Sequence, residues 1–170
     1  MKNIKKVDIE DKLFNEYCKM IEERPELRKP ENKILESIKN IIEKKRSVLL
    51  ICISIGKGQE FFDILNNDYK GNVMKYFTQE DESTINNILS VGKIIVATNL
   101  AGRGTDIKIT DELEQNGGLH VIVTFLPINQ RVEEQNYGRA GRKGEPGTWQ
   151  LILNYQDTMN KFYLNYFNQF

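Results

Sequence analysis

The feature that most constrains the fold is an apolar run, Val48–Ile53, which contains no charged residue and no polar–apolar alternation. Such a strand must be buried on both faces, because each face receives every second side chain. Further short apolar segments follow it, separated by helical patterns of about ten residues. Strands that alternate with helices favour right-handed crossovers and an open, mostly parallel sheet flanked by helices. The sequence therefore predicts an α/β fold.

The predicted strands occupy 47–53, 72–77, 93–97, 119–123 and 148–153, and the predicted helices occupy 31–45, 58–67, 79–90 and 129–139. Amphipathic segments at 8–23 and 155–168 add a predicted helix at each end. Because Pro25 and Pro30 interrupt the first of these, we expect a helical extension over 1–30 and one domain over 31–170. The aromatic face of 155–167 either packs back on this domain or docks a protein partner.

Composition narrows the class of protein. The 170 residues include 24 basic and 24 acidic side chains, and this balance disfavours a dedicated nucleic-acid binder. No apolar run is long enough to cross a bilayer, and the basic start leads into no signal-peptide core. Two distant cysteines, Cys18 and Cys52, fit neither a disulfide framework nor a zinc site. We expect a reducing compartment, either cytoplasm or an organelle stroma, and leave peripheral membrane association open.

Ligands of open α/β sheets bind beyond the carboxyl ends of the strands, and we expect three glycine-containing segments to lie there. These segments are 54–58, 97–107 and 135–144. In the second, Gly102 and Gly104 permit a tight turn with exposed N–H groups, and Asp106 can accept a hydrogen bond from a sugar hydroxyl. An ordinary strand-to-helix turn with a solvated Arg103 is the structural alternative.

The third segment carries a pair of arginines. Arg139 and Arg142 lie three residues apart at the predicted end of a helix, so they emerge on one side of it. Two planar guanidinium groups held side by side suit a polyphosphate. A solvated arginine pair is again the alternative, although two such loops in one sheet make coincidence a weaker explanation.

These segments resemble known motifs. Ala97–Ile107 is similar to motif V of superfamily 2 helicase-type ATPases, and Gln135–Arg142, with the pattern Q-x-x-G-R-x-G-R, is similar to motif VI. The wording of motif V, together with Gly117–Ile122 and Ile53–Lys57, resembles the SecA family of protein-translocation ATPases in particular. The resemblance covers 31–168 in register.

The resemblance implies a RecA-like, P-loop NTPase-type fold and, within it, the helicase C-terminal lobe, one of two lobes that enclose ATP. It implies that Arg139 and Arg142 stabilise charge that develops on the phosphates, as arginine fingers do.

The remaining site residues also follow from the resemblance. Gly104 and Asp106 would line the nucleotide, Arg103 would relay to the partner lobe, and Gln135 would orient motif VI. No metal ligand or nucleophile is predicted in this chain.

A complete ATPase needs a phosphate cradle, G-x-x-x-x-G-K-S/T, and this sequence contains none. Gly56-Lys57-Gly58 lacks the spacing and the hydroxyl, and Asp111–Glu114 is better explained as an exposed helical turn than as a magnesium-binding acidic box. The chain is therefore expected to supply half of a site. ATP and Mg²⁺ would bind only with a P-loop lobe, from the same or another chain, and polypeptide would be the substrate of the complete motor. No hydrolysis is expected from this chain alone.

Two departures from the SecA pattern keep alternatives open. Phe125–Gln130 replaces a charged run, and Tyr137 occupies a position that the family fills with Arg. Both remove charge near the expected nucleotide cleft. The Phe125–Gln130 segment and the aromatic face of 155–167 favour a catalytically silent scaffold or protein-interaction domain as the first alternative. An RNA helicase lobe is the second, disfavoured by the neutral charge and by the Gly117–His120 stretch. We expect His120 to be structural and bonded to a neighbouring loop, and Trp149 to serve in packing.

Overall fold

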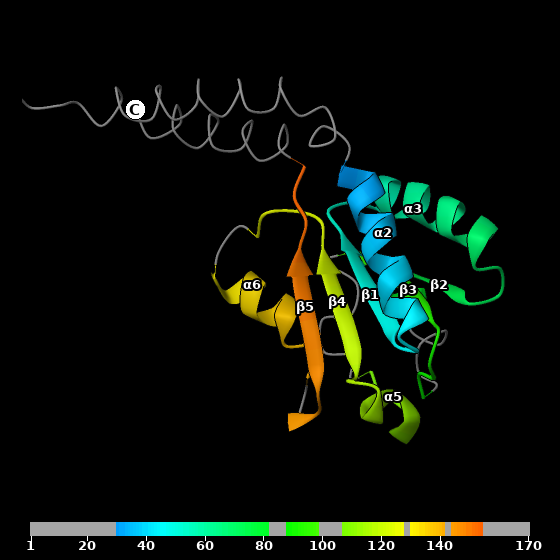
Figure 1. Cartoon of the computed structure of the whole chain (residues 1–170). Helices are drawn as coiled ribbons and strands as arrows, with labels where there is room; N and C mark the ends of the chain where they lie inside the picture. The colour runs from blue at the N-terminus through cyan, green and yellow to red at the C-terminus, as the bar shows by residue number, and fades with distance from the viewer. Residues whose placement is uncertain (1–29, 82–87, 99–106, 128–129, 142–143, 155–170) are drawn as a thin grey trace, which may run out of the picture.

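The computed structural model describes residues 30–81, 88–98, 107–127, 130–141 and 144–154. The helices predicted at 8–23 and 155–168 lie outside the described residues. Within them, five strands form one sheet in the order β2-β3-β1-β4-β5, and every neighbouring pair is parallel (Figure 1). The predicted open parallel α/β sheet is confirmed.

The strands are β1 (Ser47–Cys52), β2 (Val73–Tyr76), β3 (Ile94–Thr98), β4 (Leu119–Val123) and β5 (Gly147–Leu151). The helices are α2 (Pro30–Glu43), α3 (Ile55–Asp68), α5 (Asp111–Gln115) and α6 (Gln130–Tyr137), with a 3₁₀ turn, η2, at Gln79–Asp81. The predicted strand boundaries are therefore correct to within two residues.

The apolar run of the sequence forms the central strand. All residues of β1 are buried, and β1 pairs with β3 on one side and β4 on the other. Val48, for example, lies beside Ile94 and His120. The double-sided burial expected from the sequence is confirmed, because helices or loops cover both faces of the sheet.

Helices α2 and α3 cover one face of the sheet (Figure 1). Ile34 and Ile38 of α2 and Phe61 and Leu65 of α3 pack with side chains such as Leu50. On the opposite face, Leu113 of α5, Phe125 and Ala140 pack with Leu49 and Ile51 of β1. The exposed helical turn predicted at Asp111–Glu114 is part of α5, and its Leu113 is fully buried.

Two predicted helices differ from the structure. The helix predicted from 58 begins at Ile55, because Ser54 caps it by accepting a hydrogen bond from the Lys57 N–H. The helix predicted over 79–90 is wrong at its end, where Leu89 pairs with Ile109 as an isolated bridge and Ile88 is 61% exposed. The apolar spacing there therefore reflects an extended segment that buries one side chain and exposes the next.

We expect Gly147→Ala to destabilise the domain strongly, since an added Cβ would overlap the Ala140 carbonyl oxygen. The unfolding free energy in urea should fall by about 3 kcal/mol or more, the upper range for overpacking. Gly56→Ala, in the first turn of α3, is the control: an added Cβ would lie 4.0 Å from the Ser54 hydroxyl oxygen, so stability should hold or rise by about 0.5–1 kcal/mol. Equal stabilities of the two variants would contradict this account.

Candidate functional site

The motif VI segment begins on α6, which carries a buried stripe. Val132 and Asn136 of α6 and Ala140 beyond it are buried, at helical spacing. The turn that follows is closed by two backbone hydrogen bonds: the Gly138 N–H donates to the Glu134 carbonyl at 2.8 Å, and the Ala140 N–H to the Tyr137 carbonyl at 2.9 Å. The sheet therefore holds both α6 and the first residues after it.

This turn lies at the amino edge of the sheet, not at the carboxyl edge as the sequence predicts. Gly147 begins β5 and pairs with Leu119, the first residue of β4. The Ala140 carbonyl lies against the backbone of Gly147, so closely that a Cβ at this position would not fit. The physical reason is that a helix between two parallel strands must return the chain to the amino end of the next strand.

The two described ends of the segment 97–107, which resembles motif V, lie at opposite edges of the sheet. Thr98 ends β3 at the carboxyl edge, whereas Lys108 accepts a hydrogen bond from the Leu89 N–H at 2.7 Å. Leu89 lies at the amino edge, because the next residue, Ser90, accepts a hydrogen bond from the hydroxyl of Ser47, where β1 begins. Ile107 also packs in the same apolar cluster as Ala140. The end of the segment that resembles motif V and the turn in the segment that resembles motif VI therefore share one face of the sheet.

The predicted site residues are only partly within the described chain. Gln135 is exposed on α6, and Arg139 is half-buried in the turn after it, next to buried Ala140. Arg103, Gly104 and Asp106 lie within 99–106, and Arg142 lies within 142–143, both outside the described residues.

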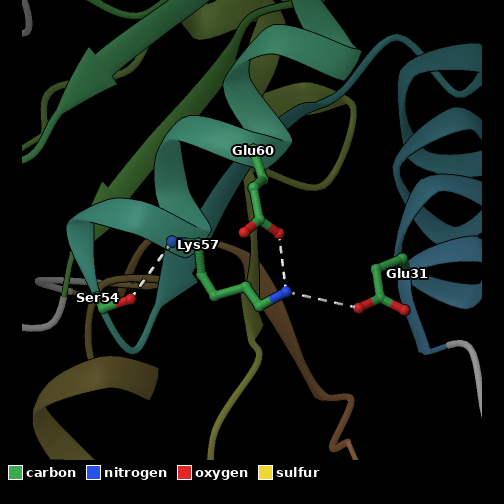
Figure 2. Close-up of polar contacts among 4 residues, drawn as sticks. All are labelled: Glu31, Ser54, Lys57 and Glu60. Carbon is green, nitrogen blue, oxygen red and sulfur yellow. Dashed lines mark hydrogen bonds and ion pairs between the residues drawn. The ribbon is translucent and has the colours of Figure 1, made fainter.

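The segment 54–58 lies at the carboxyl edge, as predicted, but it is built as a helix start. Figure 2 shows the Lys57 ammonium between two carboxylates, with Nζ at 2.7 Å from Glu60 and 4.0 Å from Glu31 of α2. Gly58 lies against the Phe77 ring, where an added Cβ would come within 2.7 Å. The glycine therefore serves helix packing, and the lysine charge is balanced locally.

Sequence reasoning missed a polar network at the amino edge. Arg46 precedes β1 and donates from Nε to the Gly118 carbonyl at 2.9 Å and from Nη2 to the Thr148 hydroxyl at 2.8 Å. His120 Nδ1 lies 2.7 Å from the same hydroxyl. The sequence predicts a bond from this histidine to a neighbouring loop, but its partner is Thr148 of β5. This network ties the start of β5 to β1 and β4.

Burial, together with the positive charge of Arg46, lowers the pKa of His120 to about 4. Burial also lowers the pKa of Arg46 from its ordinary value. His120 is therefore neutral at physiological pH, and it can share a hydrogen bond with Thr148 without adding a second positive charge beside Arg46.

A stacked aromatic pair lies on the other face of β5. The rings of Tyr137 and Trp149 are 3.7 Å apart between centroids and 18° apart in plane. Tyr137 is the last residue of α6, and Trp149 is 51% exposed. The sequence predicted packing for Trp149 but gave no sign of its partner, because the pairing depends on how the turn after α6 folds back.

Comparison with solved structures identifies the class of fold. Domain 2 of the DEAD-box helicase Mss116p, solved bound to an RNA duplex, matches with a TM-score of 0.53 and 20% identity over 72% of this chain and 47% of that one. T. fusca Cas3 with ATP matches with a TM-score of 0.53 and 15% identity, over 72% of this chain and 16% of that one. The chain has the fold of RecA-like helicase domains.

Sequence comparison identifies the family. The profile described as "SecA P-loop domain" matches residues 7–116 and 109–168. The chain belongs to the SecA family. The relative SecA 2 of Nitrosospira multiformis is 35% identical over 128 residues, which are 74% of this chain and 19% of that protein. SecA of Helicobacter pylori is 35% identical over 133 residues, 76% of this chain and 15% of that protein.

The chain spans less than a fifth of the length of these protein translocase subunits. In the described part of the chain, no helix is both long and apolar enough to cross a membrane. The same part contains no cluster of three or more His, Cys, Asp or Glu residues that could hold a metal ion.

The lowered pKa of His120 predicts a pH dependence of stability. The unfolded chain takes up a proton near the ordinary value of 6.5, whereas the folded chain resists protonation until about pH 4. As the pH is lowered from about 6.5 to about 4, the unfolding free energy should therefore decrease by about 3 kcal/mol because of this residue. Above pH 7 this residue should cause no pH dependence of stability.

Urea unfolding of the wild type and of His120→Gln at pH 7, 5.5 and 4.5 measures this contribution. The stability difference between the two should change with pH in favour of the variant as the solution becomes more acidic. A difference that stays constant across the three pH values would contradict the buried, neutral histidine.

Proposed function

We propose that residues 31–170 are the C-terminal motor lobe of a SecA-like protein translocase and that 1–30 is an extension of it. The lobe contributes motifs V and VI to an ATP site that it shares with a P-loop lobe, in the same or another chain. The observation that carries this proposal is the placement of Arg139. It lies in a turn fixed to the sheet, on the face where the end of the motif V segment also packs.

Family and fold support the proposal. Membership of the SecA family makes ATP and Mg²⁺ the expected ligands, and the relatives are named as subunits of a protein translocase. One of the structures that share the fold is domain 2 of a DEAD-box helicase. We propose polypeptide as the substrate of the complete motor and a reducing compartment at the membrane surface as its place of action.

The described residues of this lobe suit the triphosphate better than the metal. A half-buried arginine in a hydrogen-bonded turn suits a phosphate oxygen, and no acidic cluster for Mg²⁺ occurs among the described residues. The P-loop lobe would hold Mg²⁺, which neutralises phosphate charge when bound. In this proposal, Arg139 and Arg142 bind the phosphates and stabilise their developing charge.

The other site residues would hold the nucleotide and the motif in place. Gly104 and Asp106 line the nucleotide, with the Asp106 carboxylate accepting from a sugar hydroxyl. Arg103 contacts the partner lobe. Gln135, which is exposed four residues before Arg139, orients motif VI.

The test joins this chain to its P-loop lobe in one protein. Arg139→Ala and Arg142→Ala should each lower kcat for ATP by about 10³-fold, since an arginine finger acts mainly in the transition state. Nucleotide affinity, measured by titration, should change much less. Arg131→Ala is the matched control, because Arg131 is exposed at the opposite end of α6 and should leave kcat unchanged.

Three results would count against the proposal. Wild-type protein that carries both lobes and hydrolyses no ATP would favour the silent scaffold. Turnover that survives both arginine substitutions would remove motif VI from the reaction. Salt-sensitive RNA binding by the same protein would favour the helicase alternative.

A further inference from the structure

We infer that the stacked pair Tyr137–Trp149 is a positioning device that fixes the motif VI turn and so sets the place of Arg139. The inference rests on the proposed function and deepens it by assigning two residues that sequence motifs do not include. Neither ring is taken to touch the nucleotide. Both act through the backbone that carries the arginine.

Arg139 lies between two anchors. Two residues before it, Tyr137 stacks on Trp149 of β5. One residue after it, buried Ala140 packs in the apolar cluster on the sheet and donates its N–H to the Tyr137 carbonyl. Only Gly138 separates the tyrosine from the arginine, and its N–H is bonded to Glu134. A change in the stack is therefore transmitted to Arg139 through two residues of hydrogen-bonded backbone.

Trp149, on which Tyr137 stacks, belongs to β5, and β5 is held by contacts on the opposite face of the sheet. Successive side chains of a strand point to opposite faces, so Thr148 and Trp149 point away from each other. Thr148 is held by Arg46 and lies within hydrogen-bond distance of His120. Trp149 therefore extends from a strand whose start is tied to β1 and β4, and it can serve as a fixed support although half of its surface is exposed.

Two close backbone contacts lie at the base of the turn, and the stack adds a third contact at the end of α6. The Ala140 carbonyl lies so close to Gly147 that only a glycine fits, and Gly118 meets the Pro146 carbonyl in the same way. These two close contacts between carbonyl groups and glycines fix the base of the turn. The end of α6 also contacts β5 through the stack of the Tyr137 ring on Trp149. The stack therefore adds a contact that helps to fix this helix end relative to β5.

Catalytic groups must be held closely in place, because an error of 1 Å can cost about 10²-fold in rate. We therefore expect Tyr137→Ala and Trp149→Ala to lower kcat by about 10²-fold in the protein that carries both lobes, with KM for ATP changed less than about threefold. Tyr137→Phe keeps the ring and should retain most of the turnover.

A stability control separates positioning from general damage. Leu35→Ala removes a half-buried side chain of α2 that packs on the opposite face of the sheet, and it should lower the unfolding free energy without lowering kcat. Trp149 is the single tryptophan, so its near-UV circular dichroism reports the stack directly. The signal should change in Tyr137→Ala and persist in Tyr137→Phe.

The outcomes distinguish this inference from the proposed function. Full turnover in Tyr137→Ala, with Arg139→Ala inactive, overturns the positioning role alone. Equal loss in Tyr137→Ala and Tyr137→Phe also overturns it, because the ring would then not be the acting part. Full turnover in Arg139→Ala overturns both. Loss of kcat in Tyr137→Ala and Trp149→Ala, with rescue by Tyr137→Phe, supports the inference.

Discussion

The complete burial of β1 is the constraint on which the rest of the structure depends. Each backbone N–H and carbonyl group of a buried strand needs a partner, and water cannot supply one. Strands β3 and β4 supply these partners on the two sides, and the layers of α2 and α3 and of α5 and α6 exclude water from the two faces. An apolar strand that satisfies this condition can only be central, and its parallel neighbours then require crossovers.

The crossovers decide where the arginine turn lies. A helix that follows β4 must bring the chain back to the start of β5, so the residues after α6 reach the amino edge of the sheet. The motif V segment also begins at one edge and reaches the other, where Lys108 accepts a hydrogen bond from the Leu89 N–H. Two motifs that are distant in sequence thus end on the same face for a topological reason.

Much of this fold is predictable from sequence because burial has a period. The continuous apolar run located β1, further short apolar segments located the other described strands, and the apolar stripe of α2 located that helix. The helix predicted over 79–90 is wrong at Leu89, which lies in an extended segment, because a buried residue next to an exposed one fits a helix equally well. The prediction that the arginine turn lies at the carboxyl edge is also wrong. Ligands often bind at the carboxyl ends of strands, but the C-terminal end of a crossover helix lies at the amino edge.

The candidate site was predictable only as a set of residue types. Gln135 and Arg139 are placed by the structure, whereas Arg103, Gly104, Asp106 and Arg142 stay predictions because they lie outside the described residues. The Arg46–Thr148–His120 network and the Tyr137–Trp149 stack were not predictable, because each depends on the register between neighbouring strands. Register is a property of the packed sheet that no local pattern contains.

Tyr137, at a position where the resemblance to the SecA pattern implies an arginine, has a physical consequence for the proposed shared site. An arginine at the end of α6 could be attracted by the phosphates, and the same attraction could draw it away from the sheet. A tyrosine stacked on Trp149 carries no charge at physiological pH, so nearby phosphates exert no net pull on it. In the proposed site, the end of α6 would therefore keep its place whether or not nucleotide is bound. Arg139 would then approach the partner lobe already oriented, and little binding energy would be needed to order it.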